Sequence, residues 1–199
     1  MIMKLPALLG FAAVALMASP AFAAPYVYEP EHCEFKITFP EKPFIENKCT
    51  SGPDKECTEV VTYTKVVSGD ASVDFRVTCD ALTEDERAGY TSEGLAESVR
   101  QMAASSSITI GDVDSSTKDG YQVAAVVSVG MRSEREIFYT GQSWLGKKSI
   151  FRLEANMQGG QNDKADAVFT DILKSMIPKT AAKKTEPPMS VPPAKTEKN

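Results

Sequence analysis

The stretch CTEVVTYTKVVSGDASVDFRVTC, residues 57–79, decides the fold because it contains two predicted strands and the turn between them. Apolar and polar residues alternate on both sides of Ser68-Gly69-Asp70, a pattern typical of a β-hairpin. A turn centred near residue 68 predicts that Val61 faces Phe75, so that apolar residues share one side of the hairpin. The same register predicts that the cysteines at its two ends lie opposite each other.

The preceding segment follows the same pattern. Residues 34–39 alternate between polar and apolar side chains, and the turn residues 40–43 lead into a second predicted strand over 44–49. A hairpin centred near residue 41 predicts that Cys33 lies opposite Cys49.

The first 23 residues have the three parts of a secretory leader. Lys4 supplies the basic start, residues 5–17 are apolar, and Ala21-Phe22-Ala23 is a small-residue site of the kind that signal peptidases accept. We expect cleavage before Ala24. The apolar part is about 13 residues long, whereas a transmembrane helix needs roughly 20. We therefore expect no membrane insertion after cleavage, a retained anchor being the alternative.

Export determines how the four cysteines are interpreted. They are Cys33, Cys49, Cys57 and Cys79. Exported chains meet oxidising conditions, so an even number of cysteines predicts two disulfides. A zinc site would need closely spaced pairs, and the intervals of 15, 7 and 21 residues do not provide them. The hairpin registers predict the bridges Cys33–Cys49 and Cys57–Cys79, with one pair left reduced and buried as the alternative.

Beyond residue 82 the hydrophobic period changes from 2 to 3.6. Thr83 followed by three acidic residues is a capping-box pattern, which predicts a helix that starts near residue 84 or 92 and ends near 104. A closing helix is expected after Asn162. Further strands are expected over residues 108–113, 121–131, 134–144 and 148–155, with a hairpin turn at Lys118-Asp119-Gly120. This order predicts an α+β fold, an antiparallel sheet of hairpins covered on one face by two helices.

Charge divides the mature chain into two parts. Residues 24–177, the expected single domain, contain 16 Lys and Arg against 25 Asp and Glu, a net charge of −9. Such a surface repels nucleic acid and anionic lipid, so we expect no nucleic-acid partner. Residues 178–199 are rich in Lys and Pro, which predicts a disordered tail with a net charge of +3. The tail is either a tether to an acidic partner or a solvated terminus.

The order of elements resembles that of the PsbP-like group of proteins. The resemblance rests on Phe35-Lys36-Ile37-Thr38-Phe39-Pro40, the hairpins, the middle helix, a strand meander with Arg152 near its end, and the closing Phe169-Thr170-Asp171-Ile172-Leu173-Lys174-Ser175 segment. The group includes the photosystem extrinsic subunit and bacterial DcrB-type envelope proteins. The resemblance implies an α/β sandwich with an accessory or binding role, and it assigns no functional residue of this chain.

No sequence motif points to a cofactor or a metal site. His32 is the one histidine, and it precedes Cys33 in an extended segment. Neighbouring side chains of a strand point to opposite faces, so we do not expect a Cys–His catalytic dyad. Asp112 and Asp114 lack the further ligands and the glycine of a calcium-binding loop.

Tyr139 and Trp144 are the candidate recognition residues, because aromatic side chains near loops can anchor a partner. The alternative is that both complete the core between the sheet and a helix.

Two functions follow from these observations. The preferred one is a secreted or periplasmic non-catalytic binding or accessory protein, a monomer whose partner is an envelope protein or polymer. The alternative is a small hydrolase whose chemistry is carried by carboxylates such as Glu134, Glu136 and Glu154. Convergence of two of these carboxylates in a concave pocket would favour the enzyme.

Overall fold

The computed structural model describes residues 24–51, 57–105, 109, 111–132 and 134–179. The predicted leader and residues 180–199 of the predicted tail lie outside the described residues. Within the described ranges, no helix has both the length and the apolar composition required to cross a bilayer.

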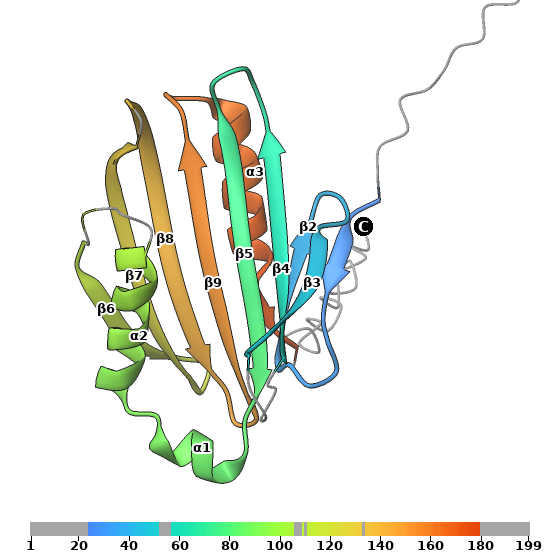
Figure 1. The fold of residues 1–199 in the computed structure, drawn as a ribbon, viewed down its shortest axis with the longest axis vertical. Helices are drawn as coiled ribbons and strands as arrows, with labels where there is room; N and C mark the ends of the chain where they lie inside the picture. The colour runs from blue at the N-terminus through green and yellow to red at the C-terminus, as the bar shows by residue number, and fades with distance from the viewer. Residues whose placement is uncertain (1–23, 52–56, 106–108, 110, 133, 180–199) are drawn as a thin grey trace, which may run out of the picture.

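Seven strands form the main antiparallel sheet, in the order β3-β4-β5-β9-β8-β7-β6 (Figure 1). They are β3 (Phe44–Cys49), β4 (Cys57–Val66), β5 (Ser72–Ala81), β6 (Val113–Lys118), β7 (Tyr121–Arg132), β8 (Arg135–Leu145) and β9 (Ser149–Gln158). Two meanders, β3-β4-β5 and β6-β7-β8-β9, therefore join along β5 and β9. The predicted α+β class with an antiparallel sheet is confirmed.

A second sheet has three strands, with β2 (Phe35–Phe39) between β1 (Tyr26–Tyr28) and β10 (Ile177–Pro178). The predicted hairpin of residues 34–49 is wrong, because β2 pairs with these terminal strands and β3 pairs with β4. The domain also continues past residue 177, since the Lys179 amide donates to the Glu34 carbonyl at 2.9 Å.

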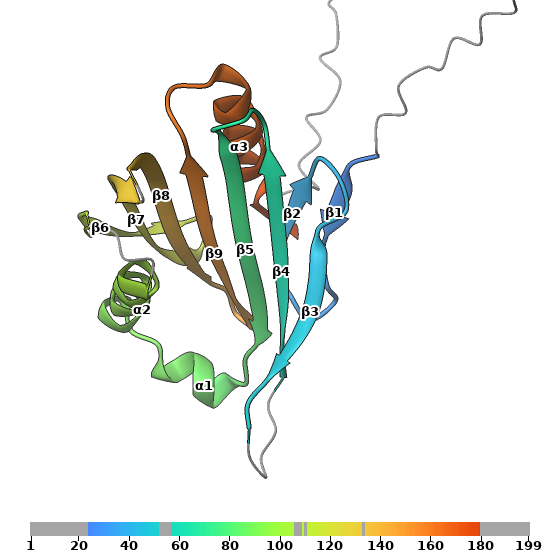
Figure 2. The same cartoon turned by 45° about the horizontal axis from the view of Figure 1, so that its top comes forward.

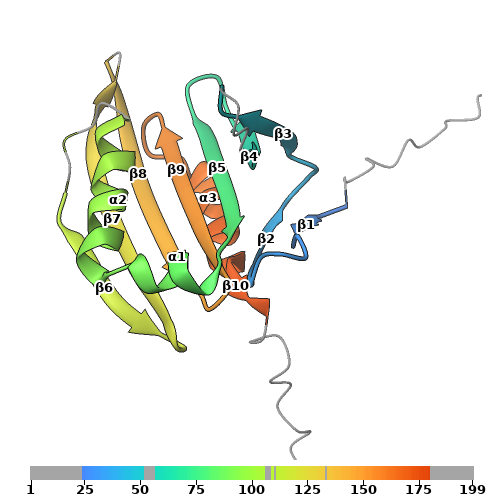
Figure 3. The same ribbon diagram turned by 60° about the horizontal axis from the view of Figure 1, so that its bottom comes forward.

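The helices of the described ranges are α1 (Glu84–Gly89), α2 (Ser92–Ser105) and α3 (Asp163–Ser175). Helix α2 packs on β6, β7 and β8, whereas α3 packs on β2, β5 and β9. The two longer helices lie on opposite sides of the main sheet (Figures 2 and 3). The prediction that both helices cover one face is therefore corrected.

The two-sided arrangement follows from the central strands, which carry apolar residues on both faces. In β8, Trp144 belongs to the core under α3, and the next residue, Leu145, belongs to the core under α2. In β9, Phe151 belongs to the core under α3 and its neighbour Ile150 to the core under α2. Because successive side chains of a strand point to opposite faces, each face needs its own cover.

Capping hydrogen bonds are present at the predicted starts of α1 and α3. The Thr83 side chain accepts from the Glu86 amide and the Glu86 carboxylate accepts from the Thr83 amide, which completes a capping box for α1. These hydrogen bonds lower the pKa of the Glu86 carboxyl. The Asn162 side chain accepts from the Lys164 and Ala165 amides and so caps α3.

The turn between β6 and β7 is also as predicted. Asp119 and Gly120 both have positive φ, 53° and 83°, as a two-residue hairpin turn requires. The strand before it begins later than expected, since β6 starts at Val113 and residues 108–113 were the predicted strand. β6 is a largely exposed edge strand without the apolar alternation on which the prediction relied.

Candidate functional site: a polar groove on the open half of the sheet

Both pairs of cysteines are oxidised, but the predicted pairing is wrong. Cys33 is bonded to Cys79, which joins the loop before β2 to β5, and Cys49 is bonded to Cys57 across β3 and β4. The first bridge is buried and the second is exposed. Among the described residues no cysteine is free.

The register of the β4–β5 hairpin explains the error. Val61 lies opposite Val77, not opposite Phe75, so the strands are shifted by two residues from the predicted register. Cys57 and Cys79 remain on one face but are no longer opposite each other. Cys49 instead lies directly across from Cys57.

Helix α2 leaves half of its face of the sheet open (Figure 2). On this open half, β4, β5 and β9 present a surface that we term the polar groove. Its residues are Thr58, Val60, Arg76, Thr78, Asp80, Arg152 and Glu154. Hollows of about 640, 380 and 160 Å³ lie along it, and Arg152 lines all three. Arg152 is therefore the centre of the groove.

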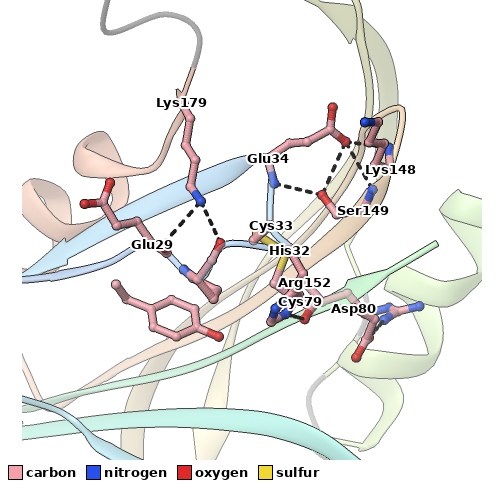
Figure 4. The surroundings of a disulfide bond; sticks show 12 residues. Glu29, His32, Cys33, Glu34, Cys79, Asp80, Lys148, Ser149, Arg152 and Lys179 are labelled. Carbon is pink, nitrogen blue, oxygen red and sulfur yellow. Dashed lines mark hydrogen bonds and ion pairs between the residues drawn. A yellow bond between two sulfur atoms is a disulfide. The ribbon is translucent and has the colours of Figure 1, made fainter.

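Arg152 is held by two partners. One guanidinium nitrogen lies 2.6 Å from the Asp80 carboxylate (Figure 4). Another donates to the Tyr90 hydroxyl at 3.2 Å. The Arg152 side chain is 28% exposed, so the pair is partly shielded from water. A planar guanidinium held in this way presents fixed hydrogen-bond donors to a ligand.

A second ion pair lies beside the Asp80–Arg152 pair. Arg76 is directly opposite Glu154 across β5 and β9, and their charged atoms are 3.7 Å apart. Burial raises the pKa of the Glu154 carboxyl, and the Arg76 guanidinium only partly opposes this effect. Arg76 itself is 53% exposed, so this cation faces the solvent of the groove.

The carboxylates of the hypothetical hydrolase do not come together. Glu154 lies in the groove, opposite Gly141 of β8. Along β8, Glu136 is five residues from Gly141, roughly 16 Å by strand geometry. The Glu136 side chain therefore points to the face opposite that of Glu154. Glu134 is exposed at the turn before β8. This trio therefore forms no shared pocket, and the predicted carboxylate site is not supported.

Tyr139 and Trp144 are buried, at 0% and 6% exposure. Tyr139 belongs to the core under α2, and Trp144 to the core under α3, where its ring centroid is 6.0 Å from that of Phe35. The Trp144 indole donates to the Gln142 side chain at 3.0 Å. The alternative stated above is therefore the correct one: both residues complete the core and form no surface patch.

His32 lines the 640 Å³ hollow, where its Nε2 is 2.9 Å from the Cys79 carbonyl. The Cys33 sulfur is bonded to Cys79, so it is not a thiol nucleophile (Figure 4). In the described ranges, no group of three or more His, Cys, Asp or Glu side chains is arranged to hold a metal ion.

Sequence reasoning missed the polar groove, although one signal was present. Asp74, Arg76, Thr78 and Asp80 alternate with Phe75, Val77 and Cys79 along β5. This alternation marks one face of β5 as polar. It does not show which partners the neighbouring strands contribute, and that depends on the β5–β9 pairing of residues distant in sequence.

Comparisons with known proteins give matches among solved structures. A scan against protein-family models and a search of curated proteins found no match. The structure is similar to the solution structure of cyanobacterial PsbP from Synechocystis sp. PCC 6803, with a TM-score of 0.46 and 11% sequence identity. The match covers 85% of this chain and 98% of that chain. No residue role is transferred from this match.

Proposed function

We propose that this protein is an exported, non-catalytic binding or accessory protein that holds an extended polar partner, an envelope protein or polymer, in the polar groove. The observation that carries the proposal is the Asp80–Arg152–Tyr90 network at the centre of the groove. It fixes a guanidinium at the meeting point of three hollows. Threonine hydroxyls beside it add donors and acceptors suited to hydroxyl, amide or carboxylate groups.

The separation of the acidic side chains supports binding rather than catalysis. A carboxylate hydrolase needs an acid and a base on the same substrate atoms. Glu154 and Glu136 face opposite sides of the sheet, and the other groove carboxylate, Asp80, is in an ion pair with Arg152. Pairs of matched charges of this kind suit recognition of a polar surface.

The disulfides support export. Two bridges stabilise the described domain, and disulfides persist mainly in oxidising compartments. The periplasm or the extracellular space is therefore the proposed location, in agreement with the leader expected at residues 1–23.

Affinity capture with matched variants tests the function. The mature chain is immobilised and exposed to envelope extract, and retained components are quantified for wild type, Arg152→Ala and Arg135→Ala. Arg135 is exposed at the far end of β8, so its variant controls for the loss of one positive charge. We expect Arg152→Ala to lower retention of a specific component about tenfold or more, as removal of a central arginine commonly does. Equal retention by both variants would show that the groove is not the binding site.

A further inference from the structure

Strand β6 is one of the two edges of the main sheet, and within the described residues only β7 pairs with it (Figures 1 and 3). Val113 at its start is half-buried, and the rest of β6 is exposed. The pairing with β7 is continuous from Val113 to Lys118 without a bulge, and β6 contains no proline. Two features that commonly block an edge are thus missing, and the outer side of β6 can accept another strand.

The charges of β6 are placed symmetrically about Ser116. Asp114 lies two residues before it and Lys118 two residues after it, so the three side chains share one face. This is the face of α3, because the Lys118 ammonium lies 5.4 Å from the centroid of the Trp144 ring. Among the described residues, neither Asp114 nor Lys118 has an ion-pair partner. A strand with this pattern is complementary in charge to a second copy of itself that runs in the opposite direction.

We infer that β6 pairs with β6 of a second copy of this chain, antiparallel and with Ser116 on the two-fold axis. In this register Asp114 lies opposite the partner subunit's Lys118, and the symmetry repeats the contact with the roles exchanged. On the other face, Ser115 lies opposite the partner subunit's Thr117. Opposite charges and pairs of hydroxyl side chains both stabilise antiparallel strands when they face each other. The two seven-stranded sheets thereby become one continuous sheet.

Helix α2 leaves room for this pairing. It packs on β6, β7 and β8, so its axis lies over β7, and three strand spacings separate the two copies of β7 in the dimer. At about 4.8 Å for each spacing, the axes of the two α2 helices are roughly 14 Å apart or more. A helix with its side chains is about 10–12 Å across, so the two helices do not collide. The polar groove on β4, β5 and β9 lies beyond β8 and remains open.

Sedimentation of the full mature chain measures the association. An edge of six residues makes a small interface, so the dimer is weak and reversible. We expect monomer at about 1 µM and a growing share of dimer up to about 0.5 mM, a range suited to weak complexes. Such a dimer would replace the monomer expected from the sequence. A chain that stays monomeric over the whole range would overturn the inference.

Reversal of one charge at a time tests the complementarity. Asp114→Lys brings two ammonium groups together at each contact, and Lys118→Asp brings two carboxylates together, so each variant alone should be a monomer. A 1:1 mixture of the two variants restores opposite charges at both contacts and should give a heterodimer. Asp166→Lys, on the exposed side of α3, changes the net charge as Asp114→Lys does and should dimerise like wild type. Dimerisation of Asp114→Lys at the wild-type level, or no heterodimer in the mixture, would overturn the inference.

Cysteine substitutions test the register. On the two-fold axis Ser116 faces its own copy at the Cα separation of about 4.5–5.5 Å found between antiparallel strands, which a disulfide can span. Ser115 is about 8 Å from its own copy in this register, which is too far for a disulfide. We expect Ser116→Cys to form a covalent dimer under mild oxidation and Ser115→Cys not to do so, and equal yields would overturn the inference. Neither result bears on the capture experiment with Arg152→Ala, because the groove lies on other strands.

Discussion

At the scale of single residues, Glu34 joins the loop before β2 to the β8–β9 turn. Its carboxylate accepts from the Lys148 amide at 2.7 Å, the Ser149 amide at 3.1 Å and the Ser149 hydroxyl at 3.3 Å. Ser149 is fully buried. We expect Glu34→Ala to lower the free energy of unfolding by about 2 kcal/mol, because charged hydrogen bonds are lost at a partly buried position. Urea unfolding measures the change.

The exposed neighbour Glu31 supplies the control, and Glu31→Ala should change the same free energy by less than about 0.5 kcal/mol. Gly146 offers an independent check, because a Cβ at this position would overlap the Glu34 carboxylate. Gly146→Ala should therefore be less destabilising in the Glu34→Ala background than in wild type. Additive effects of the two substitutions would contradict this account.

Glu154 predicts a pH dependence with a definite sign. Burial raises the pKa of its carboxyl in the folded state, so the folded protein holds this proton more tightly than the unfolded chain does. The contribution of Glu154 to the free energy of unfolding should fall as pH rises above the ordinary carboxyl pKa of about 4.3. We expect Glu154→Gln to have a higher free energy of unfolding than wild type at pH 7, despite the loss of the Arg76 ion pair. Near pH 4 the two free energies should be closer to each other.

Urea titrations at the two pH values measure this difference. Glu136→Gln is the matched control, since Glu136 is an exposed carboxylate on the opposite face of the sheet. A Glu154→Gln variant that is less stable than wild type at pH 7 would mean that the Arg76–Glu154 attraction outweighs the cost of burial.

At the scale of elements, the two disulfides should differ in their contribution to stability. The chain-entropy relation gives about 4 kcal/mol for Cys33–Cys79 and about 2.5 kcal/mol for Cys49–Cys57, whose sequence separations are 46 and 8. We expect the Cys33→Ala/Cys79→Ala variant to unfold at lower urea concentration than Cys49→Ala/Cys57→Ala. The reverse order would show that the link between β2 and β5 is not the main covalent brace.

The disulfides also show which part of the fold the sequence could predict. The period of two identified both strands and the turn of residues 57–79, and it placed the correct side chains on each face. A shift of two residues leaves every side chain on the same face, so the pattern alone could not choose between the predicted and the observed register. The partner of β2 depends on residues at the two ends of the domain, which no local pattern specifies.

At the scale of the whole molecule, the groove results from an unequal covering of the sheet. The small sheet and α3 cover β5 and β9 on one face, whereas α2 lies toward β6, β7 and β8 on the other (Figure 3). The open half of the second face carries paired charges and threonines around a single valine, Val60. Arg76 and Arg152 were visible in the sequence, but their position in one groove depends on this arrangement of layers.

Export is the prediction that belongs to the complete chain. Expression of residues 1–199 in a bacterium with a periplasm should give a mature form that begins at Ala24, because residues 1–23 have the three parts of a leader. Its intact mass should lie about 4 Da below that of the reduced chain, since each of the two disulfides removes two hydrogens. Reduction before mass spectrometry adds these hydrogens back, so the difference of about 4 Da should disappear in this control. A soluble form with the original Met1 and four reduced thiols would exclude this compartment, because the disulfides that brace the domain need an oxidising environment.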